Sequence, residues 1–104
     1  MTLWYNSYIR YFVRIRFDKK KSEQLQNDPR RKIGFEEAQE LFDNVFIEDQ
    51  HIDYPHQWRA TGWVRGELYT IVYEERKDKE GEYYHLVTLW KATKMERLNY
   101  EEKT

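Results

Sequence analysis

Histidine is the side chain best suited to proton transfer near neutral pH, and this sequence contains three: His51, His56 and His85. His85 falls in the middle of a predicted strand, where a packed or hydrogen-bonded role competes with a catalytic one. His51 and His56 lie in or beside a polar connection that also holds Asp49 and Asp53. Their spacing matches no specific metal site, so we predict a polar loop there and neither a metal nor a cofactor.

Three consecutive basic residues, Arg30, Arg31 and Lys32, precede a predicted helix. Such a run can contact the phosphates of RNA, which dominate affinity, or it can be a solvated start of the helix; the sequence favours neither. Aromatic residues on strands offer faces on which bases can stack, but they more often belong to the core. The candidates are Tyr73, Tyr84 and Trp90, of which we expect at least two in the core.

Charge is unevenly distributed, although the net charge is only −1. Residues 1–34 carry nine Lys and Arg against three Asp and Glu, whereas residues 35–55 carry seven acidic residues and no Lys or Arg. The imbalance predicts two different surfaces, one of them able to meet phosphates. The simpler alternative is that both blocks are solvated faces.

The composition indicates one folded domain. The chain has 104 residues, 17% of them aromatic, which argues against disorder. It has no cysteine, which excludes a thiol nucleophile and a disulfide framework. No apolar stretch is long enough to cross a bilayer, and the first residues lack the pattern of a signal peptide. We therefore expect a cytoplasmic protein without a membrane partner.

The first half of the chain predicts a strand and two helices. Residues 8–17 alternate between apolar and polar positions, which indicates a strand with Arg10, Arg14 and Arg16 on its wet face. Residues 18–27 read as a short polar helix capped by Asp18. Residues 35–44 have apolar side chains at helical spacing, and residues 49–55 read as a polar connection.

The second half predicts three strands and a closing helix. Residues 57–64 and 68–74 form a hairpin that turns near Arg65 and Gly66, and residues 83–91, apolar on both faces, form a central strand. Residues 93–101 begin with a capping box and end the chain as a helix. The predicted fold is α+β: a small antiparallel sheet with helices on one face, in the order β-α-α-β-β-β-α.

Several short motifs occur along these elements. They are Phe17-Asp18 with Lys21; residues 27–35, NDPRRKIGF; Phe35-Glu36-Glu37-Ala38 followed by Leu41-Phe42-Asp43; Arg59; and Lys91-Ala92-Thr93 with Glu96, Arg97 and Tyr100. In order and spacing they resemble the BrnT toxin family, which has a RelE/ParE-like fold. The similarity spans roughly residues 11–102, and residues 1–10 form an N-terminal extension without a counterpart.

The resemblance implies a single toxin domain over residues 1–104, acting as an endoribonuclease that arrests bacterial growth. It also implies a cognate BrnA-like antitoxin that neutralises the toxin, in a dimer or a hetero-tetramer. Metal-free RNA cleavage requires removal of the proton of the 2′-hydroxyl and stabilisation of the pentavalent phosphate. We expect Arg59 to stabilise that phosphate and Lys91 and Arg97 to join it across the sheet, each with an exposed charge as the competing role. His85 is the candidate acid or base.

The chain departs from the family pattern in several places, and two of these departures motivate a second hypothesis. The Lys-His-Gly of the family reads Arg30-Arg31-Lys32, and the arginine of its Ile-Ser-Ala-Arg segment is replaced by Trp90. A BrnT-like binding module that has lost catalysis is therefore the alternative. A third hypothesis is a small nucleic-acid-binding domain without a toxin role, which the near-zero net charge disfavours.

Overall fold

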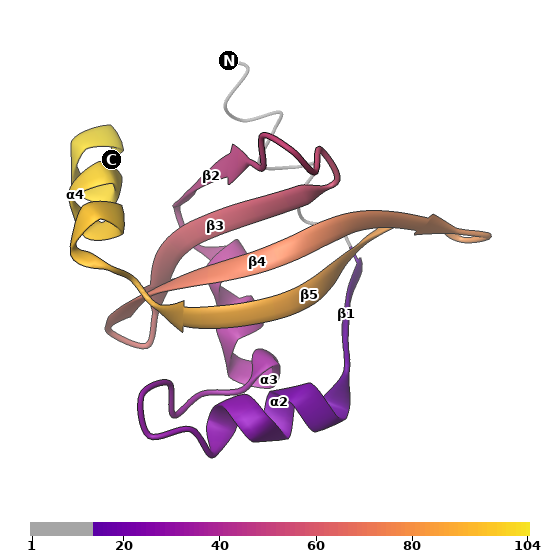
Figure 1. Cartoon of the computed structure of the whole chain (residues 1–104), viewed down its shortest axis with the longest axis horizontal. Helices are drawn as coiled ribbons and strands as arrows, with labels where there is room; N and C mark the ends of the chain where they lie inside the picture. Colours follow the sequence, from indigo (N-terminus) through magenta and orange to yellow (C-terminus); the bar gives the residue numbers. More distant parts are fainter. Residues whose placement is uncertain (1–13) are drawn as a thin grey trace.

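The computed structural model describes residues 14–104, so the predicted extension 1–10 and the first part of the predicted strand 8–17 lie outside it. Its α+β fold, as predicted, is built on a five-stranded sheet in the order β1-β5-β4-β3-β2 (Figure 1). β1 runs parallel to β5, and the other neighbours are antiparallel. The strands are β1 (Arg14–Phe17), β2 (Phe46–Gln50), β3 (Gln57–Val64), β4 (Glu67–Asp78) and β5 (Gly81–Lys91).

The predicted polar helix is α2 (Lys19–Gln26), and its cap is the predicted Asp18. The Asp18 carboxylate accepts hydrogen bonds from the backbone N–H groups of Lys20, at 2.8 Å, and Lys21, at 3.2 Å. Because these groups have no partner within the helix, the carboxylate determines where α2 begins.

The predicted helix over residues 35–44 is divided into α3 (Phe35–Ala38) and a 3₁₀ turn, η1 (Gln39–Asp43). Apolar residues three positions apart share a face in both helix types, so the sequence pattern could not distinguish them. Ser22 joins α3 to α2: its hydroxyl accepts from the Phe35 N–H at 2.8 Å and donates to the Glu36 carboxylate.

One strand, β2, was not predicted from the sequence. β2 begins before the predicted polar connection over residues 49–55 and overlaps only its first two residues. It pairs with β3, so the observed order is β-α-α-β-β-β-β-α. The charged residues of β2, Glu48 and Asp49, disfavour a strand by propensity. Short, charged strands are nevertheless common at sheet edges, where pairing with a long neighbour supplies their hydrogen bonds.

The predicted turn between β3 and β4 is observed. Arg65 and Gly66 have positive φ angles of 50° and 85°, the conformation required by a two-residue hairpin turn. β4 and β5 continue past the predicted strand ends to a tight turn after Asp78, so their hairpin projects beyond the rest of the sheet (Figure 1).

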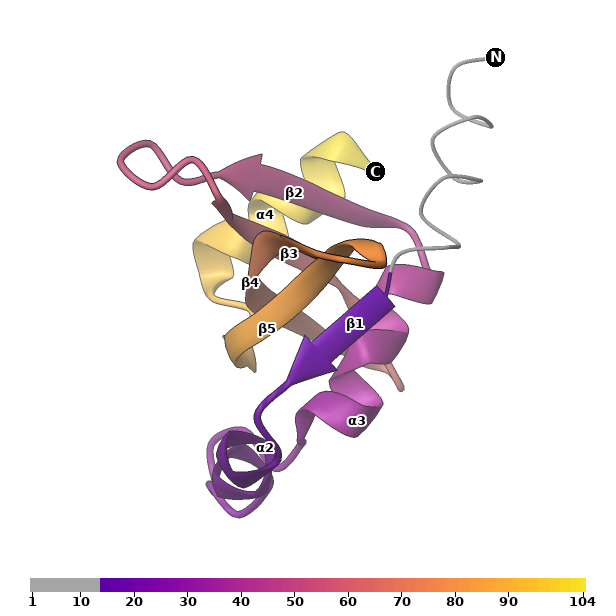
Figure 2. The same ribbon diagram turned by 90° about the vertical axis from the view of Figure 1, so that its right-hand side faces the viewer.

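One face of the sheet, the covered face, packs against α2, α3 and η1 (Figure 2). Phe35, Ala38, Leu41 and Leu89 are fully buried there. The ring of Phe42 meets the ring of Tyr73 edge-on at 5.4 Å. This apolar layer forms the core of the domain.

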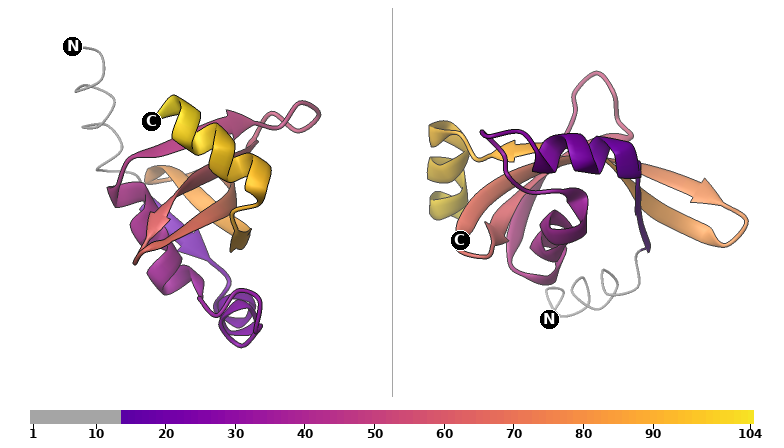
Figure 3. Two further views of the ribbon diagram at one scale, coloured as in Figure 1. Left: turned by 90° about the vertical axis from the view of Figure 1, so that its left-hand side faces the viewer. Right: turned by 90° about the horizontal axis from the view of Figure 1, so that it is seen from below.

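The last helix, α4 (Lys94–Lys103), corrects the prediction that all helices share one face. Its Glu96 accepts from the Thr70 hydroxyl at 2.9 Å, while Ile71, the next residue of β4, is in the core. Successive side chains of a strand point to opposite faces, so α4 lies on the face opposite α2 and α3, across β2 and β3 (Figure 3). Between residues 14 and 104, no helix is long and apolar enough to span a bilayer.

Candidate functional site on the open face of the sheet

The face opposite α2 and α3, which we call the open face, carries a row of polar side chains across four strands. Arg16 of β1 lies opposite His85 of β5, His85 lies opposite Glu74 of β4, and Glu74 lies opposite Gln57 of β3. Directly opposite residues point to the same face of a sheet. These residues form the central row. α4 contacts β2 and β3 and lies at the end of the sheet away from β1 (Figure 1).

His85 is half-buried in the central row, and its pKa is lowered from the ordinary value. Burial is the largest cause, because it disfavours the charged imidazolium. The positive charge of Arg76 lowers the pKa of His85 further, whereas Glu74 and Asp18 oppose the shift. The imidazole is therefore neutral at neutral pH and able to accept a proton.

Glu74 is held as a carboxylate by its neighbours. The Arg76 guanidinium donates to it at 2.6 Å, and this hydrogen bond is the largest cause that lowers the pKa of Glu74. A hydrogen bond with Gln57 and the nearby His85 contribute in the same direction. The charge of Glu74 thus remains beside His85 across the neutral range.

A second row of the open face combines arginines with an aromatic ring. Arg14 and Arg16 stand over the Tyr83 ring, with their guanidinium carbons 5.3 and 4.6 Å from its centroid. Both arginines also pair with Asp78, at 2.7 and 3.0 Å, and the hydrogen bond with Arg14 is the main cause that lowers the pKa of Asp78 to about 2. The two rows together place Arg14, Arg16 and Arg76 around one aromatic ring and one imidazole.

Arg59, the predicted phosphate-binding residue, lies on β3 of the open face and is already paired. Its guanidinium donates to Asp49 at 2.6 Å and lies 3.4 Å from Glu96, and the hydrogen bond with Asp49 is the main cause that raises its pKa. Its side chain remains 46% exposed. Arg59 is two strands away from His85, roughly 10 Å by ordinary strand spacing, so the two residues do not form one compact centre.

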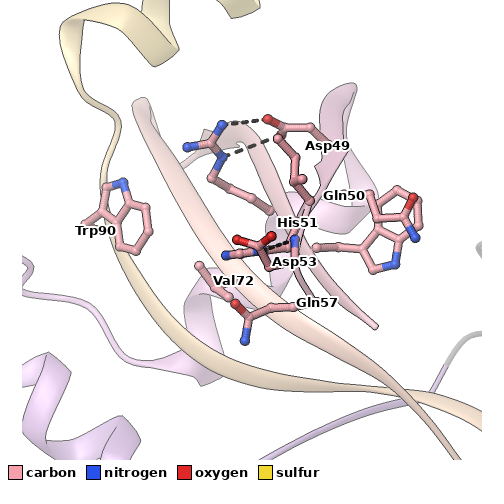
Figure 4. Close-up of a pocket in the computed structure, with 10 residues that line it drawn as sticks. Asp49, Gln50, His51, Asp53, Gln57, Val72 and Trp90 are labelled. Atoms are coloured by element: carbon pink, nitrogen blue, oxygen red, sulfur yellow. Dashed lines mark hydrogen bonds and ion pairs between the residues drawn. The ribbon is translucent and has the colours of Figure 1, made fainter. Parts of the chain in front are cut away.

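Trp90 and the β2–β3 loop flank a hollow of about 460 Å³ beside Arg59 (Figure 4). The indole N–H of Trp90 donates to Glu96 at 3.0 Å. In the loop, His51 Nδ1 accepts from the backbone N–H groups of Asp53, at 3.1 Å, and Tyr54, at 3.2 Å. His51 thus organises the polar loop that the sequence predicted.

Lys91 and Arg97 do not join Arg59, contrary to the expected convergence. Lys91 follows Trp90 on β5 and lies opposite Tyr69, so its side chain belongs to the covered face. Arg97 lies on α4 with its guanidinium 5.7 Å from the Trp63 ring centroid. The error came from treating strand ends as neighbours without knowing which face each side chain takes.

The basic run also lies away from the open face. Arg31 donates to the Leu89 carbonyl at 2.7 Å and to Asp28 at 2.7 Å, which ties the loop between α2 and α3 to β5. Arg30 is mostly exposed beside Asp28, and Lys32 is exposed with a φ of 62°. Arg31 therefore has a structural role, and Arg30 and Lys32 are the more exposed residues of the run.

The central row could not be predicted from the sequence, apart from His85. Arg14 and Arg16 were correctly assigned to the wet face of their strand, but their proximity to His85 depends on the parallel pairing of β1 with β5. The expected core position of two aromatic residues is confirmed: Tyr73 is buried, and Tyr84 packs against the core. The third candidate, Trp90, lines the hollow.

Comparison with known proteins does not extend this description. The chain matches no family model, and no curated protein matches it significantly. In the part of the chain that the structure describes, no three His, Asp or Glu residues gather as a metal-ligand set. The finding that stands is a small α+β domain with a five-stranded mixed sheet.

Proposed function

We propose that this chain is a BrnT-like toxin: a cytoplasmic, metal-independent endoribonuclease neutralised by a cognate BrnA-like antitoxin, with its active site in the central row of the open face. The observation that carries the proposal is His85, half-buried with a lowered pKa and flanked by Arg16 and Arg76. A neutral imidazole beside two guanidinium groups is a combination suited to breaking a phosphodiester bond. The order of the sequence motifs supports the family assignment.

In the proposed reaction, His85 accepts the proton of a ribose 2′-hydroxyl, whose oxygen forms a bond to the adjacent phosphorus. The bond from phosphorus to the 5′-oxygen of the next nucleotide breaks, and that oxygen takes a proton from the Tyr83 hydroxyl. The products are a 2′,3′-cyclic phosphate and a free 5′-hydroxyl. Arg16 and Arg76 stabilise the negative charge that develops on the phosphate oxygens.

The arginines retain donors for this role although they are paired with carboxylates. A guanidinium group has five N–H donors, and the Arg76 groups that bind Glu74 are Nε and Nη2. The side chains of Arg16 and Arg76 are 50% and 46% exposed, so a phosphate can reach them. Glu74 orients Arg76 and does not contact the substrate.

The test is cleavage of a labelled single-stranded RNA by the purified chain in the presence of EDTA, together with growth of a bacterial host that expresses it. We expect His85→Ala to lower cleavage about 10²- to 10⁴-fold and to relieve growth arrest. His56→Ala, in the exposed loop, is the matched control and retains activity. A DNA of the same sequence lacks the 2′-hydroxyl and remains intact.

Arg59→Ala tests whether the active site lies in the central row or around Arg59, as expected from the sequence. Loss of cleavage in Arg59→Ala but not in His85→Ala would move the active centre to Arg59. Lys91→Ala is expected to retain activity, because Lys91 lies on the covered face.

A catalytically inactive BrnT-like binding module is the second candidate function. It is favoured by the engagement of Arg59 with both Asp49 and Glu96, which leaves the expected phosphate-binding residue neutralised. This candidate predicts a folded chain that binds its antitoxin but neither cleaves RNA nor arrests growth. Absence of cleavage by the folded wild-type chain would support it over the ribonuclease.

A further inference from the structure

The hollow beside Trp90 takes no part in the proposed chemistry of the central row. Trp90 lies on one side, and His51 and Asp53 of the β2–β3 loop lie on the other (Figure 4). Val72 and Arg59 also line this hollow, which we call the Trp90 pocket. Its volume of about 460 Å³ is sufficient for a large side chain or a small ligand.

The Trp90 side chain is held in place before any ligand arrives. Its indole N–H lies 3.0 and 3.3 Å from the two carboxylate oxygens of Glu96. Glu96 is itself held by the hydroxyl of Thr70 and the backbone N–H of Thr93, both at 2.9 Å. A ring that is already immobilised loses little entropy when a ligand stacks on it, and the face of an indole attracts cations.

The charges around the Trp90 pocket favour a cation. The Asp49 carboxylate is paired with Arg59 at 2.6 Å. The Asp53 carboxylate, in contrast, makes no hydrogen bond or ion pair with any residue of the described chain, and Asp53 is exposed. The pocket therefore retains uncompensated negative charge, which repels a phosphate and attracts a cationic group.

The pocket and its rim together suit one kind of ligand. A guanidinium group is planar, stacks on aromatic faces and pairs with carboxylates, while its aliphatic stem packs against apolar side chains such as Val72. Ile52, which also lines the pocket, is 94% exposed, and Tyr54, two residues further along the same loop, is 65% exposed, so the loop offers apolar surface to a partner. We propose that the Trp90 pocket receives an arginine side chain of a partner protein, with the guanidinium between Trp90 and Asp53.

This proposal goes beyond the proposed nuclease activity and can be tested without RNA. The experiment is an NMR titration of the isotope-labelled full chain, followed through the indole N–H signal of Trp90, which Trp90→Phe identifies. The probe is N-acetyl-arginine methylamide. The matched probe is N-acetyl-citrulline methylamide, which has nearly the same size and no charge.

We expect a saturable shift of the Trp90 signal with the arginine probe and little shift with the citrulline probe. Asp53→Asn should weaken binding of the arginine probe about threefold, because it removes an exposed ionic partner. Asp43→Asn, the same change at an exposed residue of η1, should leave binding unchanged.

Three results would overturn the proposal. They are the absence of a saturable shift with the arginine probe, equal binding of both probes, and equal affinity of the wild type and Asp53→Asn for the arginine probe. Saturable binding of uridine or adenosine monophosphate at Trp90 without binding of the arginine probe would identify a base-binding pocket instead.

Discussion

The two faces of the sheet are held together by different interactions: buried apolar side chains on one, and ion pairs on the other. On the covered face, side chains such as Phe35, Leu41 and Leu89 are fully excluded from water. On the open face, arginines and carboxylates pair in rows that remain partly exposed. Burial of a large apolar side chain is worth about 1.5–3 kcal/mol, whereas an exposed ion pair is worth about 0–1 kcal/mol. The comparison indicates that the covered face supplies stability and that the open face holds charged groups in position.

Phe35→Ala tests the stabilising role of the covered face most directly. The ring is fully buried and lies 5.4 Å from the ring of Phe17, so its removal leaves a cavity. We expect the free energy of unfolding to fall by about 3–5 kcal/mol in a denaturant titration. Tyr83→Ala, which removes a half-exposed ring from the open face, should lower it by about 1 kcal/mol. Equal losses for the two variants would contradict the division between the faces.

Glu96→Ala is expected to have the next largest effect, because the Glu96 carboxylate is largely buried. Its side chain is 11% exposed and accepts from Thr70, Trp90 and the Thr93 backbone. We expect a loss of about 1.5–3 kcal/mol in the free energy of unfolding, together with a change in tryptophan fluorescence.

The control for that change is Glu96→Gln, which keeps an oxygen acceptor and should destabilise the chain less. If Glu96→Ala were as stable as the wild type, α4 would not be anchored to the open face through this carboxylate.

A smaller effect should appear in the dependence of stability on pH. The pKa of Asp78 is about 2 in the folded chain, against an ordinary value of 3.8, mainly because of its hydrogen bond with Arg14. The pairing therefore stabilises the fold above pH 3.8 and ceases to do so as the pH falls towards 2. In thermal melts, Asp78→Asn should lose less stability than the wild type on acidification, whereas Asp43→Asn should behave as the wild type. If the melting temperatures of the wild type and Asp78→Asn fell by the same amount on acidification, the pairing would be refuted.

The smallest expected effect is a displacement of the pH–rate profile. Arg76 lowers the pKa of His85, so Arg76→Gln should raise that pKa and move the acidic limb of RNA cleavage to higher pH. The position of the limb is the informative measurement, because the rate itself also falls when a phosphate-binding group is removed. Lys77→Gln, at the next position of β4, is the matched control and should leave the limb in place. If the acidic limb of the pH–rate profile stayed in place in Arg76→Gln, His85 would not be the base of the proposed reaction.

Much of the fold could be predicted from the sequence because its signals are local. Asp18 and Thr93 cap the helices that follow them, and Arg65 and Gly66 form the predicted turn. β2 escaped prediction because its acidic residues resemble a loop, and its pairing partner β3 is known only from the fold.

The candidate site was less predictable than the fold. His85 was identified by its chemistry and Arg59 by the family resemblance. Neither observation predicts which residues lie beside His85 or Arg59. Arg16 and His85 are far apart in the sequence and become neighbours through the parallel pairing of β1 with β5. Lys91 was expected to join Arg59 across the sheet, but the register of its strand places it on the covered face.

The sequence by itself determined most of the elements of this protein, because caps, turns and the spacing of apolar residues act over a few positions. Only the tertiary structure decided which elements meet: the parallel β1–β5 pair, the edge strand β2 and the position of α4 on the open face. These arrangements depend on contacts between residues distant in the chain, and local patterns carry no information about them. The central row and the Trp90 pocket both arise from such contacts.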